Sequence, residues 1–111
     1  MDNAAIVARL REIGSLPDDQ TLEIDDFPLK EFDELLQQLT EPLSPIHALN
    51  LINLGPPPDT STYEVEWALV HAAENIPAEA LRDILPLADD TEVKRIIEIR
   101  LANYFKSHPN L

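Results

Sequence analysis

The chain has 111 residues, of which 44% are apolar, and its 21 acidic and 8 basic residues give a formal net charge of −13. A chain of this length and composition can bury one core, so we expect a single domain over residues 1–111. The charge disfavours nucleic acid and anionic membranes, which are bound through Lys and Arg, and it favours a basic protein as partner. Because the chain has no Cys, disulfides, thiol catalysis and Cys-ligated zinc are excluded.

We expect neither a signal peptide nor a membrane span. The first residues, Met1 to Ala4, lack the basic segment and apolar run of a signal peptide. The longest apolar stretches are far shorter than the roughly 20 residues that cross a bilayer. A chain without Cys fits a reducing compartment, and we therefore expect a cytoplasmic location.

Apolar residues recur at helical spacing along the chain and predict an all-α fold. The six expected helices cover about residues 4–13, 28–40, 45–54, 61–75, 78–85 and 92–106. Most of the ten prolines lie at helix starts or just after helix ends. The short connections favour antiparallel helix pairs, arranged as a HEAT-like solenoid fragment or as an irregular helical bundle.

The first half of the chain is expected to hold three helices around one acidic connector. Asp2 can cap the first helix and Gly14 can end it. The connector, residues 15–27, is rich in Asp and Glu. The third helix starts at Ser44, the expected N-cap, and carries apolar residues on more than one side, including Ile46, which indicates an internal helix.

The fourth helix is expected to start at Ser61, because Ser61-Thr62-Tyr63-Glu64 has the S-x-x-E form of a capping box. Helical spacing places Tyr63, Trp67 and Val70 on one strip, opposite the main apolar face. A second buried face is the favoured interpretation of this strip. The alternative is an aromatic anchor in a protein interface.

The last helix carries one charge within its apolar stripe. Arg100 falls between Ile97 and Tyr104, where a charge needs a partner. We predict that Arg100 pairs with a carboxylate, with Glu74 as the first candidate, and that its loss clearly destabilises the fold if the pair is buried.

No motif in the sequence predicts catalysis or a cofactor. His47, His71 and His108 do not have the spacing of metal ligands, and the two glycines are too far apart for a phosphate-binding loop. The paired carboxylates lie in polar runs with nothing to raise their pKa values. We therefore expect no enzyme activity, no metal and no cofactor.

The most uneven feature is an acidic block between residues 15 and 34, in which Lys30 is the only base. One interpretation is a solvated surface, with the terminal helices packed together through mixed charges. The other is a docking surface for a basic protein. The partner-binding residues predicted on this basis are Asp18, Asp19, Glu23, Asp25, Asp26, Asp33 and Glu34, with Tyr63 and Trp67 as apolar anchors.

Segment 64–76 resembles a helix of immunity protein 30, a family of small immunity proteins from bacterial polymorphic toxin systems. The positions that carry the resemblance are Val65, Trp67, Leu69, His71 and Glu74. The resemblance implies a small, acidic, cytoplasmic protein that neutralises a cognate toxin by binding it directly.

Two other functions remain open. A helical-repeat adaptor would present an apolar groove to its partner, and a mimic of nucleic acid would space carboxylates at phosphate-like intervals. The sequence leaves the oligomeric state and the identity of the toxin open.

Overall fold

The computed structural model describes residues 1–18, 20, 26–40 and 42–108. Its helices are α1 (Asn3–Ile13), α3 (Leu29–Gln37), α4 (Pro45–Ile52), α5 (Glu66–Ala73), α6 (Ala78–Ile84) and α7 (Glu92–Ser107), with a 3₁₀ turn, η1 (Leu85–Leu87), after α6. No strand occurs among these residues, and the all-α prediction is confirmed.

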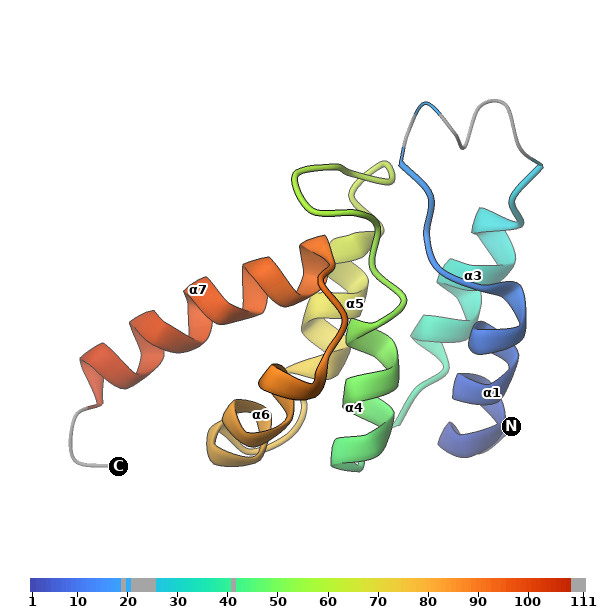
Figure 1. Ribbon diagram of the computed structural model, residues 1–111. Helices are drawn as coiled ribbons and strands as arrows, with labels where there is room; N and C mark the ends of the chain where they lie inside the picture. The colour runs from blue at the N-terminus through green and yellow to red at the C-terminus, as the bar shows by residue number, and fades with distance from the viewer. Residues whose placement is uncertain (19, 21–25, 41, 109–111) are drawn as a thin grey trace.

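The helices form two layers (Figure 1). In the first layer α4 contacts both α1 and α6, and in the second layer α5 contacts both α3 and α7. Across the layers α1 packs on α3 and α4 packs on α5, and the helices of these two pairs run in opposite directions. This arrangement resembles the stacked helix pairs of a HEAT-like solenoid.

Helix starts follow the capping residues that the sequence provides. The side chains of Asp2, Ser44 and Thr91 each accept a hydrogen bond from the backbone N–H three residues later, at 2.8, 3.3 and 3.2 Å. Gly14 ends α1 with a φ of 100°, which few other residues adopt. The boundaries of α1, α4, α6 and α7 therefore lie close to those predicted from the sequence.

The core lies between the two layers. Its fully buried side chains include Leu10 of α1, Phe32 of α3, Leu51 of α4, Leu69 of α5 and Ile97 of α7. Each of these helices thus contributes to one continuous apolar cluster.

Helix α4 is the internal helix that the sequence predicts, because α1, α5 and α6 all contact it. The inclusion of Ile46 in its apolar surface is wrong, since the side chain of Ile46 is 58% exposed. Residues two apart on a helix lie about 200° apart around its axis. Ile46 therefore faces away from the side that buries Ala48.

The predicted packing of the terminal helices against each other is also wrong. Helices α4 and α5 lie between α1 and α7, which occupy opposite ends of the molecule (Figure 1). The basic residues near the two chain ends are therefore distributed over two separate surfaces.

Candidate protein interface

Residues 56–65, the α4–α5 loop, have an unusual backbone. Asp59, Tyr63 and Glu64 have φ values of 62°, 47° and 65°, in the left-handed region. For residues other than glycine this conformation costs about 1–2 kcal/mol each, and it persists only where surrounding contacts enforce it. The predicted helix start at Ser61 is therefore wrong, because left-handed residues cannot form part of an α-helix, and α5 begins at Glu66.

A buried carboxylate holds the end of this loop. Glu66 is only 4% exposed and accepts hydrogen bonds from the Thr62 N–H and the Ser61 hydroxyl, both at 2.9 Å. The sequence pattern had assigned this role to Glu64, two residues earlier. The chain reverses at Tyr63 and Glu64, and this reversal brings Glu66 back to the loop.

A second buried carboxylate holds the start of the loop. Glu92, 6% exposed, accepts a hydrogen bond from the Asp59 N–H at 2.7 Å. Arg95 donates to both oxygens of Glu92, at 2.7 and 2.5 Å. The bonds from Arg95 and from the Asp59 N–H hold the pKa of Glu92 below its ordinary value, against the opposing effect of burial.

The loop is tied to two further segments. The Glu92 N–H donates to the carbonyl oxygen of Pro56 at 2.8 Å, which fixes the loop to the start of α7. The Thr62 hydroxyl donates to the carbonyl oxygen of Pro17, in the segment that follows α1. Three parts of the chain are thus joined at one edge of the molecule.

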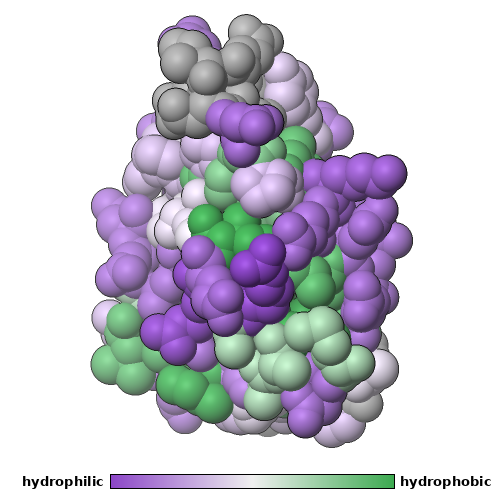
Figure 2. Space-filling model, turned by 90° about the vertical axis from the view of Figure 1, so that its right-hand side faces the viewer, coloured by the Kyte–Doolittle hydropathy of each residue, from purple (hydrophilic) through white to green (hydrophobic). Residues whose placement is uncertain are grey.

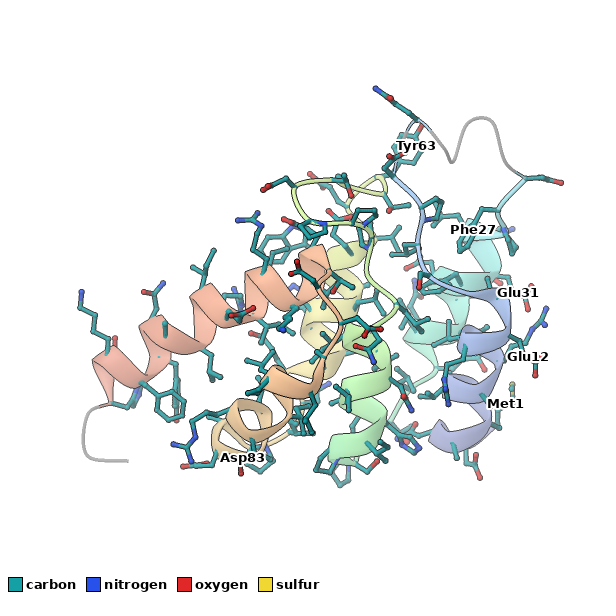
Figure 3. The ribbon with its side chains drawn as sticks, viewed as in Figure 1. Met1, Glu12, Phe27, Glu31, Tyr63 and Asp83 are labelled. Carbon is teal, nitrogen blue, oxygen red and sulfur yellow. The ribbon has the colours of Figure 1, made fainter. Side chains whose placement is uncertain are left out.

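This edge presents an aromatic side chain among acids. Tyr63 is 55% exposed and lies at the top of the molecule, beside the segment that follows α1 (Figure 3). Glu64 and Asp59 are exposed on the same loop. A large, rigid, amphipathic side chain of this kind is common at the centre of protein interfaces.

A groove of about 500 Å³ lies between the loop, the segment after α1 and the residues before α7. Asp18, Asp89 and Asp90 line it together with prolines, and none of its lining residues is basic. We call the groove and the loop beside it the loop edge. Its acidic and aromatic members are Asp18, Asp59, Tyr63, Glu64, Asp89 and Asp90.

The acids on the α1–α3 side are partly neutralised. Arg9 of α1 donates to both oxygens of Glu31 at 2.9 and 3.3 Å, and it lies 3.4 Å from Glu12. Lys30 lies 4.0 Å from Glu34. Figure 2 shows this side, where hydrophilic side chains cover most of the surface with smaller hydrophobic areas between them.

The predicted acidic residues therefore divide into groups. Asp18 lines the groove of the loop edge, and Asp26 is exposed just before α3. Asp33 accepts a hydrogen bond from Gln37 at 3.0 Å on α3. Three predicted residues lie outside the described part of the chain: Asp19, Glu23 and Asp25.

Trp67 belongs to a different surface from Tyr63. It is 39% exposed on α5, its ring centroid lies 6.0 Å from that of His71, and the guanidinium carbon of Arg100 lies 5.9 Å from it. Val70 is fully buried and Tyr63 lies in the loop, so the predicted strip of Tyr63, Trp67 and Val70 does not form. Trp67 is partly shielded, mainly by charged and polar neighbours.

The predicted pairing of Arg100 with Glu74 is confirmed. Nε and Nη2 of Arg100 donate to the two Glu74 oxygens at 2.8 and 3.0 Å, and these bonds raise the pKa of Arg100. The pair is not buried, because the Arg100 side chain is 46% exposed. The C-terminal half of α7 extends away from the other helices (Figure 1), so its stripe is only partly covered.

Sequence reasoning missed most of the loop edge. Asp89 and Asp90 precede α7, whose capping oxygen comes from Thr91. Asp59 gives no signal beyond its place after three prolines, and Glu64 stands out only as part of the capping-box pattern. Among the described residues, no group of three or more His, Asp or Glu could hold a metal ion, and no described helix could cross a membrane.

Comparison with protein-family models, with curated proteins and with solved structures finds no significant match to this chain. The resemblance to immunity proteins therefore stays a prediction.

Proposed function

We propose that this protein binds a basic protein through the loop edge and that the partner is a toxin that it neutralises. The observation that carries the proposal is the α4–α5 loop, which contains three left-handed residues and is held at both ends by buried carboxylates, while Tyr63 is presented among acids. Strained backbone that the surrounding structure enforces is most common at functional sites.

Rigidity and charge each contribute to such binding. A loop already fixed in its bound form loses little conformational entropy when a partner docks, so more of the contact energy appears as affinity. Aspartates and glutamates around Tyr63 attract a basic surface and raise the association rate. The net charge of −13 extends this attraction over the whole molecule.

The experiment first captures the partner from the organism that encodes the chain, with the wild-type protein as bait. Association of the purified partner is then measured with a loop-edge variant, Glu64→Lys/Asp89→Lys/Asp90→Lys. We expect association at low salt to be slower by about tenfold or more, with a smaller difference at high salt, because added ions screen exposed charges. A further loss of affinity is expected for Tyr63→Ala.

The matched control changes three exposed acids on α6 and α7, Glu79→Lys/Asp83→Lys/Glu98→Lys, and alters the net charge equally. It should associate much faster than the loop-edge variant. Equal rates for the two triple variants would show that only total charge matters and would contradict a localised interface.

The toxin proposal needs a second measurement. Expression of the captured partner alone should arrest growth, and co-expression of the wild-type chain should restore it. The loop-edge variant should restore growth less well than the control variant. Capture of a partner that is harmless when expressed would favour the adaptor function instead.

A further inference from the structure

A second groove, of about 510 Å³, lies between α3 and α5. Two alanines one turn apart on α5, Ala68 and Ala72, leave room there because their side chains are short. The other lining residues are two leucines and four polar residues, namely Leu36, Leu39, Gln37, His71, Glu74 and Asn75. The groove thus combines an apolar floor with a polar rim that contains one carboxylate.

The carboxylate at the rim of this groove, Glu74, already binds a guanidinium group outside the groove. Arg100 donates two hydrogen bonds to Glu74 and lies close to the ring of Trp67. This pairing shows that the Glu74 side chain is oriented for bidentate contact with arginine. Glu74 also lines the depression along α7, so it lies between the two grooves.

Glu74 retains capacity for a second cation. A carboxylate offers about four lone-pair positions, and Arg100 occupies two of them. His71 lines the groove beside Glu74, with its Nδ1 3.9 Å from Glu74 Oε1. Asp33, bonded to Gln37 at the groove rim, adds negative charge from α3.

We propose that this groove seats an arginine side chain of the basic partner. Its aliphatic stem would lie on the leucine and alanine floor, and its guanidinium would bind Glu74 beside the ring of His71. The inference rests on the proposed function, because the arginine belongs to the same basic protein, and it adds a specific contact on the second helix layer.

The test uses small probes and needs no partner protein. N-acetyl-arginine methylamide and its uncharged isostere, N-acetyl-citrulline methylamide, are titrated into the ¹⁵N-labelled full chain. We expect the arginine probe to shift the amide signals of Ala68, His71 and Ala72. A charged hydrogen bond contributes about 1.5–3 kcal/mol, so the citrulline probe should bind at least about tenfold more weakly.

Two variants locate the site without disturbing the core. Gln37→Lys places a cation at the groove rim and should abolish the shifts, whereas Gln38→Lys, its exposed neighbour on α3, should leave them unchanged. The proposal would be overturned by equal shifts for the two probes or by shifts that persist in Gln37→Lys. Shifts confined to the depression along α7 would also overturn it.

The outcome separates this inference from the proposed function. One outcome is that the probe binds as expected while the loop-edge variant and its control associate with the partner at equal rates. That result would contradict the proposed function and support the arginine site. If the loop-edge variant loses the partner but the probe does not bind, the arginine site fails alone.

Discussion

The α4–α5 loop and the outer half of α7 use the same chemistry in different surroundings. In each, an arginine forms two hydrogen bonds with a glutamate. The Glu92 and Arg95 side chains beside the loop are 8% and 45% exposed, whereas those of Glu74, at the end of α5, and Arg100, on α7, are 23% and 46% exposed. Loss of a partner is costly for a buried group and inexpensive for a solvated one, so burial decides how much each pair stabilises the fold.

The largest expected effect is at Glu66, which holds the loop but pairs with no base in the described part of the chain. Glu66→Ala leaves the Thr62 N–H and the Ser61 hydroxyl without their acceptor, and each unsatisfied buried group costs about 1–3 kcal/mol. We expect the free energy of unfolding, measured with urea, to fall by about 2–4 kcal/mol. Glu98→Ala, an exposed change on α7, should stay within about 0.5 kcal/mol of wild type, and a similar loss in both variants would contradict the role of Glu66.

Glu92 should give a smaller effect that depends on pH. Glu92→Gln loses charged hydrogen bonds and should lower the free energy of unfolding at pH 7 by about 1.5–3 kcal/mol. Because the folded state holds the pKa of Glu92 below its ordinary 4.5, its contribution is complete above that pH and is lost as pH falls through the lowered value. Wild type and variant should therefore converge in acid, and a constant difference between pH 7 and pH 3 would contradict this mechanism.

Two substitutions of Glu64 test whether the loop backbone is strained at this residue. A β-branched residue is strongly disfavoured at a φ of 65°, so Glu64→Val should lower the free energy of unfolding by about 1–2 kcal/mol. Glycine adopts this conformation readily, and Glu64→Gly should be neutral or stabilising by up to about 1 kcal/mol. Thermal unfolding of the two variants gives the comparison, and equal melting temperatures would argue against a left-handed residue there.

The smallest effect should come from the exposed pair that Arg100 of α7 forms with Glu74 at the end of α5. Arg100→Met removes a solvated ion pair and a partly solvated contact with Trp67, so the free energy of unfolding should fall by about 1 kcal/mol or less. Tryptophan fluorescence during urea unfolding reports both the stability and the surroundings of Trp67. A loss as large as that of Glu66→Ala would show that the pair is buried after all.

Much of the fold follows from local signals in the sequence. Asp2, Ser44 and Thr91 lie at the helix starts because a capping side chain needs only its own next turn. The boundary of α5 could not be derived in this way, since Glu66 reaches back to the loop only after two left-handed residues. The S-x-x-E spacing favours Glu64 as the acceptor, and nothing in the local pattern identifies Glu66.

The candidate interface was harder to predict for a related reason. It is assembled from segments near residues 18, 60 and 90, which the bonds of the α4–α5 loop to Glu92 and to Pro17 bring together around one groove. Charge composition correctly placed Asp18 in an acidic region, but it could not show that Arg9 neutralises Glu31, 22 residues away. Exposure of Arg100 depends on how far α7 extends past its neighbours, which helical periodicity does not encode.

The way the α4–α5 loop is anchored has an evolutionary consequence. The buried carboxylates bind the backbone N–H groups of Asp59 and Thr62, and Glu92 also donates from its own backbone to Pro56. The side chain of Asp59 lies 3.6 Å from Arg95, whereas that of Glu64 takes no part in these bonds. Substitutions of Glu64 can therefore change which partner the surface binds without changing the fold. Related proteins could in this way adapt to a partner whose own surface changes.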